Sequence, residues 1–292
     1  MKTIENCPIC GTGEITPFMT TKDFSVSQQV FSIVKCTACD LHFTNPIPDE
    51  SKIGEYYKSE SYVSHSSSNK GIINKIYLRV RSFTLKQKLK LINRLIIGKN
   101  VLDIGAGTGH FLNTVKTAGY VVTGLEPDDD ARVFAKQNLG LELRPASDLN
   151  QLPEKSFDAI TMWHVLEHVY HLKRDLGEIN RILKPDGVLI VAVPNRASYD
   201  AQYYKEFWAA YDLPIHLYHF TPKNIGELFG QFNFEIKEIL PMKFDSFYVS
   251  MLSEKYKGGN IMNAFLVGLK SNFKAKPGFY SSQIYILKRK TQ

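Results

Sequence analysis

The sequence comprises 292 residues, of which 43% are hydrophobic and 22% charged, with a formal net charge of +7. This is ordinary globular composition, long enough for about two domains, and no apolar run approaches the roughly 20 residues that span a bilayer. The N-terminus also lacks the apolar core of a signal peptide, so we expect a cytoplasmic protein without a membrane partner.

Residues 1–50 contain two C-x-x-C pairs, formed by Cys7 with Cys10 and by Cys36 with Cys39, with 25 residues between them. This spacing matches a site of four thiolates that holds structural zinc. Local alternation between the pairs predicts small antiparallel strands. So few residues cannot bury enough surface to fold unaided, so the metal would supply the missing stability. We predict a zinc ribbon; four free buried cysteines are the alternative.

Residues 51–99 are predicted to form a linker followed by a basic helix. Residues 64–69 are polar, as in linkers, and apolar positions recur at helical spacing over 71–97. The window 61–102 holds nine lysines and arginines and no acid, whereas the rest of the chain is slightly acidic. Such local charge argues against a protein that coats nucleic acid. The basic face is either a solvated helix surface or an attraction for a phosphorylated or polyanionic substrate.

Strands and helices alternate from residue 100 onward. Strands are predicted at 100–104, 121–125, 141–144, 157–162, 187–193, 234–240 and 283–289, with amphipathic helices between the first five. The stretch 244–271 between the last two strands is predicted to be helical. This alternation predicts an α/β fold, a Rossmann-like, doubly wound, mostly parallel seven-stranded sheet that binds its ligand at the carboxyl ends of the strands.

A glycine turn follows the first of these strands, in the run VLDIGAGTGHF at 101–111. Gly105, Gly107 and Gly109 leave the backbone bare, so that a flat or anionic ligand can approach the N-terminus of the next helix. Position 110 is His, which excludes the nicotinamide fingerprint G-x-G-x-x-G. No Gly-Lys-Ser/Thr follows, which excludes a phosphate-binding P-loop.

Carboxylates are predicted at the tips of three successive strands. Asp103 ends the first strand and Glu126 follows the second, where a carboxylate suits a ribose diol. Asp148 follows the third, placed to accept from an adenine amino group while Leu149 packs on the ring. A site rich in carboxylates suits a cationic ligand better than a pyrophosphate.

The ordered set VLDIGAGTGHF, GLEP, SDLNQLPEKSFDAITMWHVLEHV and LKPDGVLIVAVPN resembles the motifs of class I S-adenosylmethionine-dependent methyltransferases. This resemblance covers residues 100–195 and implies that Glu126 holds the ribose of the cofactor. It further implies that Trp163 or His164 lies beside the sulfonium. The implied cofactor-binding residues are Asp103, Gly105, Gly107, Gly109, Glu126, Asp148, Leu149, Trp163 and His164.

Residues 164–168 read H-x-x-E-H, which also matches the zinc motif of one metalloprotease class. The motif begins at a strand end inside the methyltransferase set, so we discount the peptidase interpretation. Its position resembles the E-x-x-E-H stretch of ubiquinone-type O-methyltransferases, which binds a divalent cation, except that His164 replaces the first Glu. Glu167 and His168 are therefore either cation ligands or residues that hydrogen-bond at a helix start.

An aromatic-rich segment at 195–222 is predicted to form a lid. Thr221 and Pro222 are suited to begin the amphipathic helix predicted over 224–232, and His216 lies just before it. The arrangement resembles sugar C-methyltransferases, which also carry an N-terminal four-cysteine zinc region and in which a His before this helix acts as base. His216, with His168 and His219, is therefore a candidate catalytic residue; a satisfied structural histidine is the alternative.

We predict three parts: the ribbon (1–50), the linker and basic helical segment (51–99), and a methyltransferase domain (100–292). The predicted function is methyl transfer from S-adenosylmethionine to a small-molecule acceptor, such as a sugar or nucleotide-linked intermediate, in a protein that also holds structural Zn²⁺. One alternative is an RNA methyltransferase that uses the ribbon and the basic helix. The other is a zinc-ribbon binding module with an inactive methyltransferase domain.

Overall fold

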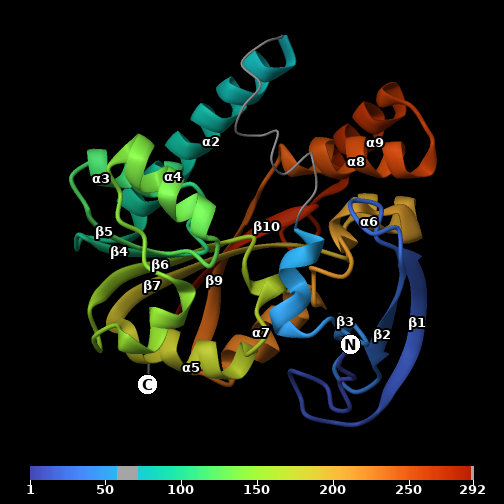
Figure 1. Ribbon diagram of the computed structural model, residues 1–292, viewed down its shortest axis with the longest axis horizontal. Coiled ribbons are helices and arrows are strands. Elements are labelled where there is room, and N and C mark those ends of the chain that lie inside the picture. The colour runs from blue at the N-terminus through green and yellow to red at the C-terminus, as the bar shows by residue number, and fades with distance from the viewer. Residues whose placement is uncertain (58–71, 291–292) are drawn as a thin grey trace.

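The computed structural model describes residues 1–57 and 72–290, and their strands form two sheets (Figure 1). The linker predicted at 64–69 lies outside the described residues. The larger sheet has six strands in the order β5-β4-β6-β7-β10-β9. Their bounds are β4 (Asn100–Ile104), β5 (Val121–Leu125), β6 (Phe157–Trp163), β7 (Leu183–Pro194), β9 (Phe234–Pro241) and β10 (Ser282–Arg289).

The pairing of these strands confirms the doubly wound, mostly parallel architecture. β4 pairs in parallel with β5 and β6, and β6 pairs in parallel with β7. β10 lies antiparallel between β7 and β9. The carboxyl ends of β4, β5 and β6 therefore meet at one edge of the sheet, where a doubly wound fold binds its ligand.

The prediction of a seventh strand at 141–144 is wrong. This segment makes only one bridge to the sheet, between Arg144 and Leu125. Two backbone bonds around Arg144 hold it beside β5, where its N–H donates to Gly124 and its carbonyl accepts from Glu126. Pro145 follows at once and has no N–H with which to continue the ladder. The short 3₁₀ helix η2 (Ala146–Gln151) begins there instead.

Helices cover both faces of the six-stranded sheet (Figure 1). α2 (Ile72–Leu95), α3 (His110–Thr117) and α4 (Asp129–Leu139) lie on one side, and α5 (Leu172–Ile182) and α7 (Pro222–Gly230) on the other. Adjacent residues of β4 point to opposite faces of the sheet: Val101 packs with α2 and α3, whereas Leu102 packs with α5 and α7. α2 confirms the helix predicted at 71–97, and α7 confirms the helix predicted at 224–232. Thr221 caps α7.

The smaller sheet is antiparallel and has the order β1-β2-β3-β8. β1 (Ile15–Lys22), β2 (Val30–Cys36) and β3 (His42–Thr44) confirm the small strands predicted in the N-terminal region. β8 (Tyr218–His219) comes from the segment predicted as a lid, and it pairs His219 with His42 and Tyr218 with Phe43. The N-terminal strands therefore share a sheet with residues that follow β7.

The lid segment and the stretch after β9 supply the remaining helices. The first contains α6 (Tyr199–Tyr204) and the 3₁₀ turns η4 (Lys205–Phe207) and η5 (Ala209–Tyr211), and it buries Tyr204, Trp208 and Tyr211 in a second core. The second contains α8 (Asp245–Lys257) and α9 (Ile261–Lys274), as predicted for 244–271. Two further 3₁₀ helices are η1 (Glu50–Tyr56) and η3 (Leu166–His168). Within the described residues, every helix is too short or too polar to cross a bilayer.

Candidate functional site

The four cysteines form one cluster in the N-terminal region. The Sγ atoms of Cys7 and Cys39 lie 3.4 Å apart, those of Cys10 and Cys36 lie 3.5 Å apart, and all four sulfur atoms lie within 4.8 Å of one another. None of them forms a disulfide. Sulfur atoms at the corners of a tetrahedral zinc site, with bonds of about 2.3 Å, lie about 3.8 Å apart. The donor set and its spacing therefore fit a structural zinc ion.

Both C-x-x-C knuckles fold in the same way. The N–H of Gly11 donates to the carbonyl of Cys7 at 2.9 Å, and the N–H of Asp40 donates to that of Cys36 at 3.0 Å. Gly11 and Asp40 both have positive φ, 79° and 62°. Burial raises the pKa of the Cys7 thiol to about 11. A cation in the cluster would offset that burial, because a coordinated thiol is deprotonated.

The predicted glycine turn lies between the tips of β4 and β5. The N–H of Gly105 donates to the carbonyl of Leu125 at 2.8 Å, and that of Gly107 donates to Oε2 of Glu126 at 2.6 Å. A Cβ added at Gly105 would come within 2.4 Å of Val165, whereas one added at Gly107 would meet no atom within 4 Å. The bare backbone of Gly107 therefore borders open space, as a cradle for a ligand requires. Gly109, also at positive φ, caps α3.

Two of the predicted carboxylates lie buried beside this turn. Asp103 accepts a bond from the hydroxyl of Thr161 at 2.5 Å, and burial raises the pKa of its carboxyl to about 7. Burial also raises the pKa of Glu126, whose Oε1 accepts the N–H of Asp128 at 3.0 Å. Among the described residues, neither carboxylate has a cation in hydrogen-bond contact, so the site is suited to a positively charged ligand.

The predicted adenine residues lie on η2. Asp148 accepts from Nε of Arg144 at 2.9 Å and from the amide of Gln151 at 3.2 Å, and the side chain of Leu149 is buried. The turn of chain after the bridge to β5 thus places both residues at the same edge as Glu126. Their contact with an adenine stays a prediction.

A lysine from the basic helix also lies in this site. Nζ of Lys88 is 4.0 Å from the ring centroid of Trp163, and burial lowers its pKa to about 8 against the opposing effect of Asp103. The sequence contained a signal for this position, because Lys88 follows Leu85 by three residues and precedes Ile92 by four. That spacing places it on the apolar face of α2.

His164, at the end of β6, lies between two carboxylates. Its Nδ1 is 3.3 Å from Oε1 of Glu167, and its Nε2 is 3.0 Å from Oδ2 of Asp245. Burial alone would lower its pKa, but the hydrogen bonds that its ring N–H groups donate to these carboxylates raise the pKa to about 10. His164 is therefore an imidazolium that ties β6 to the start of α8. Asp245 was not predicted, since no local pattern links it to residues 81 positions earlier.

His168 and His216, both predicted as catalytic, meet at one point. Their ring centroids are 4.7 Å apart, and one ligand atom from each lies within 4.8 Å of a carboxylate oxygen of Glu167. Nδ1 of His216 is 2.9 Å from the carbonyl of Ala210, and Nδ1 of His168 is 2.9 Å from that of Ile215. A carbonyl only accepts, so Nδ1 of His216 carries the proton and its Nε2 has the lone pair. Nδ1 of His168 also lies 2.9 Å from the hydroxyl of Tyr57, which can donate to this nitrogen or accept from it.

This histidine cluster (Glu167, His168 and His216) can do two kinds of chemistry. Burial lowers the pKa of His216 and lowers that of His168 to about 4, so both rings are neutral at physiological pH. Within the part of the chain that the structure describes, Oε2 of Glu167 is buried without a hydrogen-bond partner. Neutral imidazoles beside such an oxygen can accept a proton or can ligate a divalent cation. His219 lies apart on β8, where its Nε2 is 3.3 Å from the hydroxyl of Thr44.

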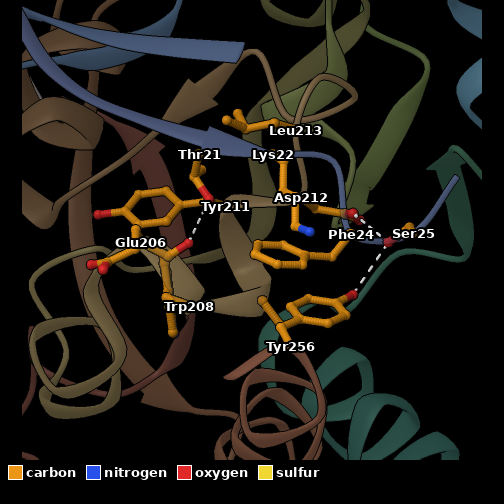
Figure 2. A pocket seen from close by; sticks show the side chains of 11 residues that line it. Thr21, Lys22, Phe24, Ser25, Glu206, Trp208, Tyr211, Asp212, Leu213 and Tyr256 are labelled. Carbon is orange, nitrogen blue, oxygen red and sulfur yellow. Dashed lines mark hydrogen bonds between the residues drawn. The ribbon is translucent and has the colours of Figure 1, made fainter. Parts of the chain in front are cut away.

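A cavity of about 10 Å³, enough for about one water molecule, lies between the end of β1, the segment around η4 and η5, and α8 (Figure 2). Beside it, Phe24 stacks on Tyr256 with centroids 4.6 Å apart. The hydroxyl of Ser25 lies 3.5 Å from Oδ1 of Asp212 and 3.2 Å from that of Tyr256. Burial raises the pKa of Asp212 to about 6, and its backbone carbonyl accepts the N–H of His216 at 3.0 Å. One residue thus links the cavity to the cluster.

Comparison with known proteins places these features in context. A family model described as a methyltransferase domain matches residues 77–239, more than half of the chain. The demethylmenaquinone methyltransferase of Tropheryma whipplei is 38% identical over 98 residues, covering 32% of this chain and 41% of that protein. The ubiquinone biosynthesis O-methyltransferase of Actinobacillus pleuropneumoniae is 34% identical over 112 residues, covering 35% and 48%. The chain thus spans less than half the length of these relatives.

Solved structures share the fold at low sequence identity. A SAM-dependent methyltransferase from Archaeoglobus fulgidus has a TM-score of 0.50 at 18% identity, over 72% of this chain and 94% of that one. The geranyl diphosphate C-methyltransferase of Streptomyces coelicolor has a TM-score of 0.51 at 13% identity, over 70% and 77%. Both likenesses show the class I methyltransferase fold. With the family match across the glycine turn and the strand tips, the chain belongs to the methyltransferase domain family.

Proposed function

We propose that the protein is an S-adenosylmethionine-dependent methyltransferase that acts on a small-molecule acceptor. The observation that carries this proposal is the open backbone at Gly107, flanked by the buried carboxylates of Asp103 and Glu126. A bare turn suits the close approach of a nucleoside, and the carboxylates suit ribose hydroxyls and a sulfonium charge. When bound, S-adenosylmethionine supplies an activated methyl group.

In this proposal the residues of the chain position the reactants and move one proton. Glu126 holds the ribose, and Asp103 offsets the positive charge of the cofactor. Nε2 of His216 accepts the proton that the acceptor loses as its oxygen, nitrogen or carbon bonds to the methyl group. Positioning of this kind is worth about 7–11 kcal/mol in favourable cases, and a general base adds about 10²–10⁴-fold.

The distribution of basic residues supports a small acceptor over RNA. An RNA acceptor would need a broad basic surface, and Lys88 of the basic helix turns into the cofactor site. The curated relatives are named for quinone methylation, so quinones join sugars and nucleotide-linked compounds as acceptors to test.

Structural zinc and a cytoplasmic location form the second part of the proposal. The four free thiols have the spacing of a tetrahedral site, which leaves no open position for catalysis. Clustered thiols without disulfides are typical of a reducing compartment.

The proposal is tested by calorimetry with S-adenosylmethionine, followed by a screen of acceptors with labelled cofactor. On an accepted substrate, His216→Asn should lower kcat by about 10²–10⁴-fold and leave cofactor affinity unchanged. His171→Asn, which changes an exposed histidine paired with Glu50, is the matched control. Failure to bind the cofactor would refute the proposal.

Two further arms separate the alternatives. Activity that EDTA abolishes and Mg²⁺ or Mn²⁺ restores, with the zinc content unchanged, would assign the histidine cluster to a cation in place of a base. Methylation of RNA with a steep dependence on salt would move the acceptor to nucleic acid.

A further inference from the structure

α9 packs its small side chains inward and its large apolar side chains outward. A Cβ added at Gly268 would lie 3.0 Å from Cα of Phe247, so the small residues allow close packing on α8. The buried set is Ala264, Val267, Gly268 and Ser271. Six large apolar side chains of this helix are between 43% and 90% exposed: Ile261, Met262, Phe265, Leu266, Leu269 and Phe273. A helix that packs only within its own domain would bury such side chains.

Further exposed apolar side chains lie outside α9. On α8, Met251 is 43% exposed, and Phe244, which precedes that helix, is 42% exposed. Phe244 meets Phe83 of α2 edge to face, with ring centroids 5.8 Å apart, and Phe83 is itself half exposed. Figure 1 shows the α8–α9 hairpin at the periphery of the molecule, on the same side as the projecting α2. Exposed apolar side chains thus occur on or beside three helices.

Lysines occur along the hairpin. The sequence from 255 to 276 contains five lysines and no acid. Two of them, Lys257 and Lys274, lie over the rings of Tyr203 and Tyr199 of α6. The hairpin acids are engaged internally, because Asp245 bonds His164 and Glu254 accepts the N–H of Asn260 at 3.1 Å. Among the described residues, the lysines of the hairpin and the turn after it make no ion pair with a carboxylate; they are Lys255, Lys257, Lys270, Lys274 and Lys276.

We propose that the α8–α9 hairpin docks on an anionic membrane surface. Large apolar side chains on a helix bordered by lysines are suited to lie in the plane of the interface, with the apolar face in the acyl boundary and the ammonium groups on lipid phosphates. α9 has 14 residues, too few to span but enough to lie flat. The proposal departs from our expectation of no membrane partner, which rested on the lack of a spanning segment.

The charge pattern favours lipid over a second copy of this chain. A symmetric contact through α9 would bring two acid-free, lysine-rich borders together, and like charges at an interface disfavour association. An anionic surface complements both the apolar face and its border. α8 also supplies Asp245, which pairs with His164 at the end of β6, so the docking surface and the site share one helix.

The test is flotation of the full-length protein with vesicles of phosphatidylcholine alone or with about 30% phosphatidylglycerol. We expect binding to the anionic vesicles that weakens with salt. Met262→Ser/Phe273→Ser should reduce that binding by at least about tenfold through loss of apolar insertion. Lys270→Gln/Lys276→Gln should reduce it by about tenfold or more through loss of two charges.

Val30→Ser/Val133→Ser is the matched control, because it removes two exposed apolar side chains from β2 and α4 and should leave binding unchanged. Circular dichroism and thermal denaturation verify that each variant is folded. The proposal is overturned if the protein ignores anionic vesicles, or if the hairpin and control variants bind alike. A dimer in analytical ultracentrifugation that Met262→Ser/Phe273→Ser dissociates, with no vesicle binding, would assign the surface to a second copy.

Discussion

The carboxylate of Glu126 accepts the backbone N–H of Gly107 at 2.6 Å. This bond joins the tip of β5 to the turn after β4, two segments that are adjacent because Ile104 and Leu125 are partners in the parallel pair. It places a buried negative charge beside bare backbone at the carboxyl edge of the sheet. The relationship is the geometric centre of the proposed cofactor site.

Glu126→Gln should weaken S-adenosylmethionine binding by about 10- to 100-fold, because hydrogen bonds to a charged acceptor are worth about 1.5–3 kcal/mol. The change keeps the shape of the side chain, removes its charge and replaces one acceptor oxygen with an amide NH₂ group. Isothermal titration calorimetry measures the effect, with Glu142→Gln, an exposed acid paired with Lys136, as the control. Equal affinity in both variants would contradict the ribose assignment.

Gly107→Ala should abolish cofactor binding while the protein stays folded. Gly107 and Gly119 both have positive φ, 54° and 89°, and a Cβ at either position would meet no atom within 4 Å. Alanine should therefore cost about 1–2 kcal/mol of stability at both positions. Only at Gly107 would the methyl group occupy the ligand cradle. Thermal denaturation and calorimetry on both variants separate the two effects, and a Gly107→Ala protein that binds normally would place the cofactor elsewhere.

Cofactor affinity should rise with pH between about pH 6 and pH 8, because the pKa of Asp103 is raised to about 7 by burial. Below that pKa the carboxyl is neutral; above it a carboxylate attracts the sulfonium. The effect is at most about tenfold per pH unit. Lys88, with a pKa lowered to about 8, loses its repulsive charge at the upper end and acts in the same direction.

In Asp103→Asn, cofactor affinity should no longer rise with pH around the pKa of Asp103, and it should be lower than in the wild type at high pH. Calorimetry in buffers of matched ionic strength gives the profile. A wild-type affinity that falls as pH rises would show that Asp103 does not face the cofactor charge.

Purified protein should carry one zinc ion per chain, and Cys36→Ser should lower the melting temperature by more than about 5 °C. The reason is that the cluster ties together two knuckles that cannot bury enough surface alone. Thr37→Ser, in the same knuckle, is the control. Atomic absorption and calorimetric melting measure the two quantities. Folded protein without zinc would leave the cluster as free thiols.

Zinc loss should also reduce activity, because β3 pairs with β8 and the hydroxyl of Thr44 donates to the carbonyl of His216 at 2.7 Å. If the ribbon became disordered, His216, the proposed base, would therefore lose its position. Activity that survives complete zinc removal would show that the two regions are independent.

Local spacing in the sequence was enough to predict the features that depend on near neighbours. The C-x-x-C pairs, the glycine turn, the strands on either side of it, and the cap of α7 all require residues only a few positions apart. The same spacing led to the wrong seventh strand, because four alternating residues look like a strand whether or not a partner can accept them. Pro145 ended that ladder, which the pattern of apolar residues did not show.

Only the tertiary structure decided which distant residues meet. Periodicity indicated a basic face on α2, but contact with β6 turned Lys88 onto Trp163. Asp245 reached His164 because α8 starts where β9 ends, beside the carboxyl end of β6. His168 and His216 met because the lid segment folds back to pair with the ribbon. Sequence spacing thus determined the chemistry available at each strand tip. Helices and strands pack so that their apolar faces are buried, and this packing decided which of those groups lie in one site.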